Sequence, residues 1–286
     1  NVIPSPYTSG LLDSFFDDSL QPIVQTVRGC PFKCSFCTEG KGYWTKVRTL
    51  SQDRVSEELN YIAKKITSNG SKSRCDLFIA DSNFGMYLSD VETAKKIRTV
   101  QDKYNFPEYI SVSTGKNKKE RILEVAKIVK GAIRLAGSVQ SLDHDVLANI
   151  KRTNINAQAI LDLAKNANDL GTNSYSEVIL GLPGDSKESH FKSVKYLINA
   201  GFNKVILYQS MMLPGTEMNS PKIRSKFGLK TKWRMVPHCY GYYDMLGDEI
   251  NVAEVEEITI SSNTLSFKDY FECRRLALIV NLFYND

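Results

Sequence analysis

The sequence has no apolar run that approaches the ~20 residues needed to cross a bilayer, which argues against a transmembrane helix. The opening residues 1–7 also contain neither a basic stretch nor an apolar core, so they do not form a signal peptide. Charge of one sign is not concentrated, because 37 Lys and Arg and 32 Asp and Glu are scattered and leave a net charge of only +5. We therefore expect no membrane span and no nucleic-acid partner.

Cysteine is sparse, and its distribution argues against a disulfide framework. Three of the six cysteines fall within eight positions and three are scattered: Cys30, Cys34, Cys37, Cys75, Cys239 and Cys273. Disulfide frameworks are typical of small secreted domains with a higher density of cysteine. We therefore expect reduced thiols and a cytoplasmic location. The 42% of hydrophobic residues is enough for a sizeable core without such cross-links.

Strand-like and helix-like patterns alternate through residues 21–214. Strands are expected at 22–27, 76–80, 109–112, 132–139, 174–180 and 204–208, and helices at 52–66, 91–100, 121–129, 143–150, 157–170 and 188–199. Strands that alternate with helices indicate right-handed βαβ units and a parallel sheet, so the expected fold class is α/β. An open doubly wound sheet and a barrel both satisfy this pattern. In both, the chemistry gathers at the carboxyl ends of the strands.

The pattern changes at about Pro214. Residues 214–250 are rich in turn formers and aromatic residues, whereas 255–260 has a strand pattern and 267–282 a helix pattern. We therefore expect residues 215–286 to form a C-terminal α+β extension.

Cys30, Cys34 and Cys37 stand in a loop directly after the first expected strand. A structural zinc site normally takes a fourth Cys or His at a defined spacing, and the next candidates, Cys75 and His144, form no second ligand pair. Three ligands on an iron–sulfur cube instead leave one iron open to a substrate or cofactor. The spacing favours such a cluster, and it leaves a zinc site and redox or inert thiols as alternatives.

The C-x3-C-x2-C spacing, with Phe36 before the last cysteine, resembles the cluster motif of the radical S-adenosylmethionine (SAM) superfamily. The resemblance implies that the three cysteines bind a 4Fe–4S cluster whose open iron chelates the amino and carboxylate groups of SAM, with Phe36 among the cofactor-binding residues. An electron from the cluster then cleaves SAM to a 5′-deoxyadenosyl radical, which abstracts hydrogen from the substrate. The implied fold is a partial (β/α)6 TIM-like barrel over residues 21–214.

Two later motifs extend the resemblance to SAM-binding side chains. Residues 79–84 resemble the Asp-x-Asn-Phe variant of the cobalamin-binding branch, which implies that Asn83 contacts the SAM amine. Gln140 and Arg152 are twelve positions apart, as in the coproporphyrinogen-dehydrogenase-like members, where such a pair contacts SAM. Arg152 suits the SAM carboxylate, because a guanidinium can pair with a carboxylate through two hydrogen bonds.

The fifth and third expected strands supply the remaining candidates. Residues 177–184 resemble the superfamily's G-x-I-x-G-x-P-G stretch, which implies that Glu177 binds the SAM ribose hydroxyls or amine and that Ile179 packs on adenine. A carboxylate in so apolar a strand also needs a partner. The third strand departs from the pattern, since it offers Ser113 in a segment where some relatives have glutamate. Ser113 is included among the SAM-binding candidates.

Residues 1–20 resemble the linker that joins an N-terminal cobalamin-binding domain to a radical SAM core. The resemblance implies that this chain is part of a longer protein and that the whole protein uses cobalamin. We expect reductive SAM cleavage followed by radical chemistry, such as cobalamin-dependent methylation. The substrate is an unidentified small molecule, lipid, sugar, tetrapyrrole or peptide, and the electron donor is a protein such as flavodoxin or ferredoxin. Two alternatives stay open: a methylthiotransferase of the same superfamily and a zinc-stabilised binding module.

Overall fold

The computed structural model describes residues 3–68, 74–115, 117–154, 161–162, 164–165 and 172–285. The strands are β1 (Ile23–Val24), β2 (Val27–Arg28), β3 (Arg48–Thr49), β4 (Asp76–Phe84), β5 (Tyr109–Thr114), β6 (Leu135–Ala136), β7 (Ser174–Leu180), β8 (Lys204–Gln209), β9 (Lys230–Met245) and β10 (Asp248–Ser261). The helices are α1 (Gln52–Ser68), α2 (Leu88–Tyr104), α3 (Lys119–Ile128), α4 (His144–Asn149), α6 (Lys187–Asn199), α7 (Pro221–Phe227) and α8 (Phe267–Phe283), with 3-10 turns η1 (Asp13–Phe15) and η2 (Thr38–Gly40).

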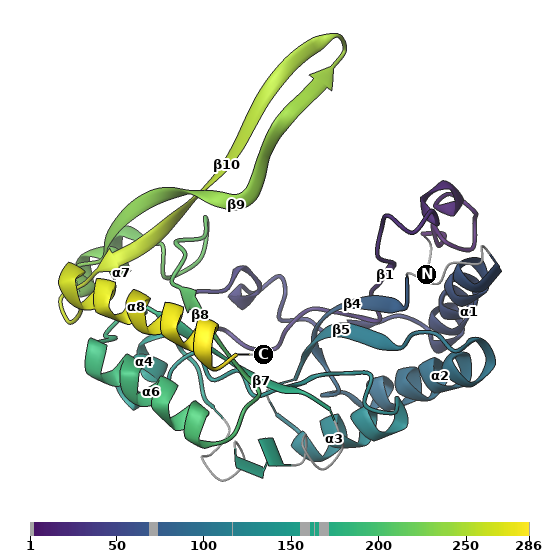
Figure 1. Cartoon of the computed structure of the whole chain (residues 1–286), viewed down its shortest axis with the longest axis horizontal. Helices are drawn as coiled ribbons and strands as arrows, with labels where there is room; N and C mark the ends of the chain where they lie inside the picture. Colours follow the sequence, from purple (N-terminus) through teal and green to yellow (C-terminus); the bar gives the residue numbers. More distant parts are fainter. Residues whose placement is uncertain are drawn as a thin grey trace.

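The strands that alternate with helices form two three-stranded parallel sheets. One has the order β1-β4-β5 and the other the order β6-β7-β8. A single parallel bridge from Ile110 to Ile133 connects β5 to the segment that leads into β6. Figure 1 shows these strands as a curved row, with α1, α2, α3 and α6 along its outer side. The predicted α/β class with parallel strands is therefore confirmed.

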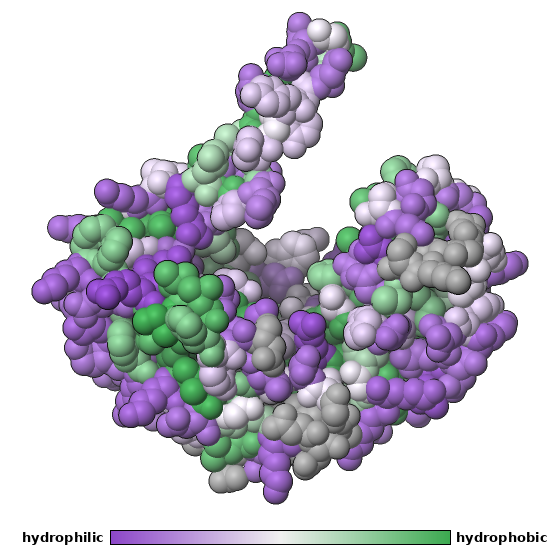
Figure 2. Space-filling view, viewed as in Figure 1, coloured by the Kyte–Doolittle hydropathy of each residue, from purple (hydrophilic) through white to green (hydrophobic). Residues whose placement is uncertain are grey.

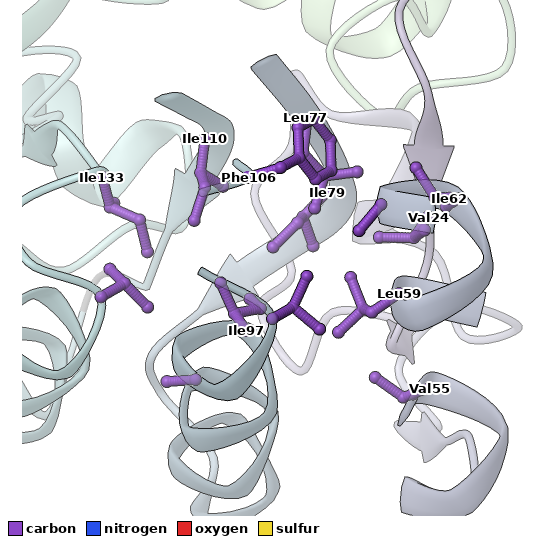
Figure 3. Packing of buried hydrophobic residues seen from close by; sticks show 14 of the residues in the cluster. Val24, Val55, Leu59, Ile62, Leu77, Ile79, Ile97, Phe106, Ile110 and Ile133 are labelled. Atoms are coloured by element: carbon purple, nitrogen blue, oxygen red, sulfur yellow. The ribbon is translucent and has the colours of Figure 1, made fainter. Parts of the chain in front are cut away.

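The core of the first half lies between its sheet and helices α1 and α2 (Figure 3). Apolar residues recur at helical spacing in α1, so Val55, Leu59 and Ile62 are buried on one face. Alternation in β4 buries Leu77 and Ile79 in the same cluster. A second cluster joins β6, β7 and β8 to residues of α6 and α8. Each of the two parallel sheets is therefore held in place by its own hydrophobic core.

One expected element is shorter than predicted, and a second agrees with its prediction. Within the strand expected over 132–139, only β6 pairs continuously with a neighbouring strand. Isolated bridges at Ile133 and at Gln140, just beyond this range, make the other strand contacts of the segment. Within the segment expected as helical turns over 143–150, α4 begins after Asp143, whose side chain accepts from two backbone N–H groups. The helix expected over 157–170 lies largely outside the described residues.

After α7 the chain forms a long antiparallel hairpin, whose first strand lies in the segment 214–250 that is rich in turn formers and aromatic residues. The hairpin runs from the pair Lys230–Ser261 to the pair Met245–Asp248, with two irregularities in register, and it projects from the body (Figure 1). Aromatic residues are favoured in strands when a pairing partner is present. That partner, β10, contains the strand expected over 255–260, and α8 corresponds to the helix expected over 267–282.

Across the described ranges, none of the helices combines the length and apolarity needed to cross a membrane.

Candidate active site

The three clustered cysteines lie in a loop that the antiparallel pair β2 and β3 closes. Within the loop, the Cys30 N–H donates to the Trp44 carbonyl over 2.9 Å. Ser35 bonds to two distant segments: its N–H donates to the Ile150 carbonyl (3.0 Å) and its carbonyl accepts from the Met218 N–H (2.9 Å). The loop backbone is therefore fixed by hydrogen bonds from several parts of the chain.

Two glycines allow the loop to fold this tightly. Gly29 has a φ of +103°, and a Cβ at this position would lie 2.7 Å from the carbonyl oxygens of Trp44 and Lys46. A Cβ on Gly40 would collide with the carbonyl oxygen of Cys34. The close approach of the backbone around the cysteines thus depends on glycine at both positions.

The cysteines themselves are protected from solvent. Cys30 is 7% exposed and Cys34 is 4% exposed, whereas Cys37 is half-buried. All six cysteines fall in the described residues, and none of them forms a disulfide. Among all the residues that the structure describes, no three His, Cys, Asp or Glu side chains are grouped closely enough to hold a single metal ion.

A cavity of about 400 Å³ lies beside the cysteine loop. Its lining includes two of the cysteines and four of the predicted SAM-binding residues: Cys30, Cys37, Ser113, Gln140, Arg152 and Glu177. These residues come from the loop, from the end of β5, from the middle of β7, and from the segments that follow β6 and α4. Side chains that are far apart in the sequence therefore share one cavity at the carboxyl ends of the parallel strands.

Arg152 is a buried cation at this cavity, with only 6% of its surface exposed. One guanidinium nitrogen donates to the Ser138 carbonyl, and Nε donates to Asn154 Oδ1 over 3.0 Å. Burial lowers the pKa of Arg152, and the charge of Cys34, followed by a hydrogen bond with it, opposes that shift. The remaining nitrogen, Nη1, is buried without a partner among the described residues. An unpaired buried donor on a cation suits an anionic ligand.

Gln140 and Glu177 lie on neighbouring backbone segments. The Gln140 N–H donates to the Glu177 carbonyl, and the Ile179 N–H donates to the Gln140 carbonyl, both over 2.8 Å. Gln140 has a φ of +63°, so the chain turns away from β7 at this residue. The Glu177 carboxylate accepts from Ser138 Oγ over 2.5 Å. Glu177, the acid predicted to bind SAM, therefore has a hydrogen-bond partner at the cavity wall.

Four predicted site residues do not line the cavity: Cys34, Phe36, Asn83 and Ile179. Asn83 is buried, and its Nδ2 donates to Cys30 Sγ over 3.2 Å, while its Oδ1 has no partner among the described residues. Phe36 and Ile179 instead pack at the edge of a hydrophobic cluster that contains Leu182 and Met212.

The cavity also contains chemical groups that the sequence analysis did not select. Asp81, Lys119 and Tyr175 line it. Burial raises the pKa of Asp81 and lowers that of Lys119. Burial, followed by the charge of Glu177, raises the pKa of Tyr175 to about 12. The strand pattern contained a signal for Tyr175, since it precedes Glu177 by two positions and so points to the same face of β7.

The sequence profile of the radical SAM superfamily matches residues 24–197, which is more than half of the chain. The chain belongs to the radical SAM superfamily. The predicted resemblance is thus confirmed, and the chain is part of an enzyme. Radical SAM enzymes use a 4Fe–4S cluster and SAM, so these are the cofactors of the family to which this chain belongs.

Two curated relatives match nearly the whole chain. It is 30% identical over 292 residues to the 2-(S-pantetheinyl)-carbapenam-3-carboxylate methyltransferase of Streptantibioticus cattleyicolor, with coverage of 99% of this chain and 41% of that protein. It is 28% identical, with the same coverage, to the cobalamin-dependent radical SAM methyltransferase TokK of Streptomyces tokunonensis. The chain therefore spans about two fifths of the length of the curated relatives it matches.

Solved structures resemble the fold. The radical SAM methyltransferase TsrM from Kitasatospora setae, with tryptophan and the SAM analog aza-SAM bound, matches with a TM-score of 0.67 at 14% identity. The match covers 93% of this chain and 53% of TsrM. The coproporphyrinogen III oxidase HemN from Escherichia coli matches with a TM-score of 0.52 at 17% identity, over 71% of this chain and 48% of HemN. At these identities the similarity concerns the fold alone.

Proposed function

We propose that this chain is the radical SAM core of a cobalamin-dependent methyltransferase that acts on a small molecule. The proposal rests on one observation. The cysteine loop and the buried, incompletely paired Arg152 line the same cavity. The two curated relatives support the methyltransferase assignment, because both are named as methyltransferases and one as cobalamin-dependent.

The proposed architecture is a partial (β/α)6 barrel over residues 21–214. The parallel orders β1-β4-β5 and β6-β7-β8 and the bridge between Ile110 and Ile133 support it, since they give six parallel strands in one succession. Residues 1–20 would then be the linker and 215–286 the extension. The six cysteines without disulfides support a cytoplasmic location.

The residues at the cavity fit the cofactors of the family. We assign Cys30, Cys34 and Cys37 to the 4Fe–4S cluster because thiolates from one loop are its usual ligands. Arg152 Nη1 and Asn83 Oδ1 are a buried donor and a buried acceptor that have no partner in the part of the chain that the structure describes. SAM offers a carboxylate for the first and an ammonium group for the second. When bound, the cluster supplies the electron for reductive cleavage of SAM, and cobalamin supplies a carrier for the methyl group.

The other side chains orient SAM and limit access of water. Glu177 offers a carboxylate to ribose hydroxyls or to the amine, and Gln140 and Ser113 offer neutral hydrogen-bonding groups. Phe36 and Ile179 lie together in one apolar cluster and would form the support beneath the adenine. Burial of Cys30 and Cys34 limits the access of solvent to the loop. Flavodoxin or ferredoxin is the class of protein we propose as electron donor.

The test of this assignment is SAM binding by protein reconstituted with iron and sulfide under anaerobic conditions. Loss of a hydrogen bond to a charged group costs ~1.5–3 kcal/mol, so Arg152→Ala and Glu177→Ala should each weaken SAM binding roughly ten- to a hundredfold. The cluster should still assemble in both variants. The measurement is a SAM titration followed by the change in the electron paramagnetic resonance signal of the cluster.

Arg234→Ala is the matched control, because Arg234 belongs to the hairpin and pairs there with Glu256. It should bind SAM with wild-type affinity. Wild-type affinity in Arg152→Ala and Glu177→Ala as well would show that these two residues have structural roles only.

A further inference from the structure

The carboxyl end of β4 carries two buried polar side chains, Asp81 and Asn83, beside the segment that leads to Cys30. Leu77 and Ile79 alternate into the core with α1 and α2, and the same alternation continues to Asp81 and Asn83. Asp81 is 3% exposed and Asn83 is 2% exposed. Polar groups buried to this extent are costly unless they are paired. Both side chains find their partners in the segment that contains the first cysteine.

Asp81 binds the backbone where that segment begins. Its carboxylate accepts from the Thr26 N–H (2.8 Å), the Thr26 hydroxyl (2.5 Å) and the Val27 N–H (3.0 Å). Thr26 and Val27 lie at the junction of β1 and β2, a few residues before Cys30. The Leu50 N–H in turn donates to the Thr26 carbonyl over 2.9 Å, which ties the far end of the cysteine loop to the same point.

Asn83 binds the sulfur itself. Its Nδ2 donates to Cys30 Sγ over 3.2 Å, and the pair is buried. A hydrogen bond to a ligand sulfur withdraws electron density from it and thereby stabilises the reduced form of an iron–sulfur cluster. The two residues are two positions apart on one strand, so one rigid element holds both the base of the loop and one of its thiols.

We propose that Asp81 and Asn83 are positioning residues for the cluster. Asp81 sets the backbone at which the cysteine loop starts, and Asn83 orients the Cys30 sulfur and raises the reduction potential of the cluster. The proposal rests on the proposed function in one respect, which is that Cys30 is a cluster ligand. If wild-type protein binds no iron–sulfur cluster, the proposed function fails before either variant is considered.

The first experiment measures iron and sulfide per chain after anaerobic reconstitution of Asp81→Asn. An amide at this position leaves one acceptor oxygen for the three donors and turns its NH2 group toward at least one of them, so we expect the variant to lose most of the cluster while it stays folded by circular dichroism. Asp185→Asn is the matched control. Asp185 is equally buried, and it also accepts three hydrogen bonds, from Gly181, Ser186 and Ser189, in the loop after β7.

The Asp185→Asn protein should keep the full cluster even if its thermal stability falls. Full iron in a folded Asp81→Asn protein would overturn the role of Asp81. Equal loss of iron in the Asp81→Asn and Asp185→Asn proteins would also overturn it, since the effect would then be one of general stability.

The second experiment is a redox titration of the cluster without SAM, followed by electron paramagnetic resonance, in Asn83→Leu. The variant should bind the cluster, and at the wild-type midpoint its ratio of reduced to oxidised cluster should fall by about two- to tenfold. This change corresponds to a hydrogen bond worth about 0.5–1.5 kcal/mol. Because SAM is absent, any role of Asn83 Oδ1 in SAM binding does not affect the measurement.

Asn203→Leu serves as the control, because Asn203 accepts from Ser174 at the opposite end of the strands. It should titrate as the wild type does. Asn83→Ala is measured in parallel in case the larger side chain prevents folding. An unchanged ratio in the folded Asn83 variants would overturn the role of Asn83.

Discussion

The parallel strands and the β9–β10 hairpin are both β-structure, yet they are stabilised in different ways. In the parallel strands, side chains such as Leu77 and Ile79 are buried under helices. In the hairpin, Trp233, Tyr240 and Tyr242 are largely exposed. This hairpin, called the arm below, stands away from the rest of the molecule, the body, in the space-filling view (Figure 2). Residue types that favour strands are therefore present in both regions, but only in the body do they form a core.

The base of the hairpin is the exception to this exposure. Ile258 and Thr259 are buried, and the Thr259 N–H donates to the Ser210 carbonyl over 2.9 Å. Arg224 forms hydrogen bonds with Glu257 at 2.8 Å and 2.5 Å. The arm is thus attached to the end of β8 at its base, whereas its outer part depends on the cross-strand ladder alone. An isolated two-stranded hairpin is only marginally stable in water.

The largest expected difference between body and arm concerns cysteine. Cys34→Ala should abolish the cluster, whereas Cys239→Ala, in the arm, should leave about four irons per chain after anaerobic reconstitution. Cys30→Ala and Cys37→Ala should behave as Cys34→Ala does, because all three thiols are assigned as ligands. The measurement is iron and sulfide analysis. Full iron in Cys34→Ala, or zinc without sulfide in the wild type, would contradict the cluster assignment.

The next difference concerns the free energy of unfolding. Leu59 is 1% exposed, and Leu59→Ala should lower the stability by ~2–5 kcal/mol because it leaves a cavity between α1 and β4. Tyr242 is 70% exposed, and Tyr242→Ala should change the stability by less than about 0.5 kcal/mol. Urea denaturation followed by circular dichroism measures both. Losses of similar size would mean that the arm is packed against another part of the protein in solution.

The smallest expected difference is in the pH dependence of stability. Burial raises the pKa of Asp185 to about 6, so its contribution is fully present below about pH 4 and is lost as the pH rises through about 6. The hydrogen bond from Arg224 lowers the pKa of Glu257, so its contribution is present above about pH 4.5 and is lost as the pH falls. The two acids therefore act with opposite sign.

Denaturation midpoints of wild type, Asp185→Asn and Glu257→Gln between pH 3 and 7 test this prediction. Relative to Asp185→Asn, the wild type should lose stability from pH 4 to 6, by at most about 3 kcal/mol. Relative to Glu257→Gln, it should lose stability as the pH falls below about 4.5. Parallel curves for all three proteins would show that neither acid has a shifted pKa.

Much of the body was predictable because its signals are local. The helical spacing of Val55, Leu59 and Ile62 predicted α1, and the apolar run from Asp76 predicted β4. The hairpin was not predictable from the same signals, because the exposed aromatic residues of β9 show no buried face, although the partner strand β10 follows directly after the turn at 246–247. Of the predicted site residues, Ser113, Gln140, Arg152 and Glu177 line the cavity with Cys30 and Cys37, and Asn83 instead contacts Cys30.

The sequence by itself determined the cysteine spacing, the alternation of strands and helices, and the side-chain types that the site contains. Each of these depends on residues that are neighbours along the chain, where the geometry of a helix turn or a strand pleat is the same in every protein. Only the tertiary structure decided that Arg152 meets Ser138 and the Cys34 thiol, and that Asp81 holds the residues before Cys30. Such contacts depend on how the parallel strands curve and how the loops pack at their carboxyl ends, and no local pattern encodes that geometry.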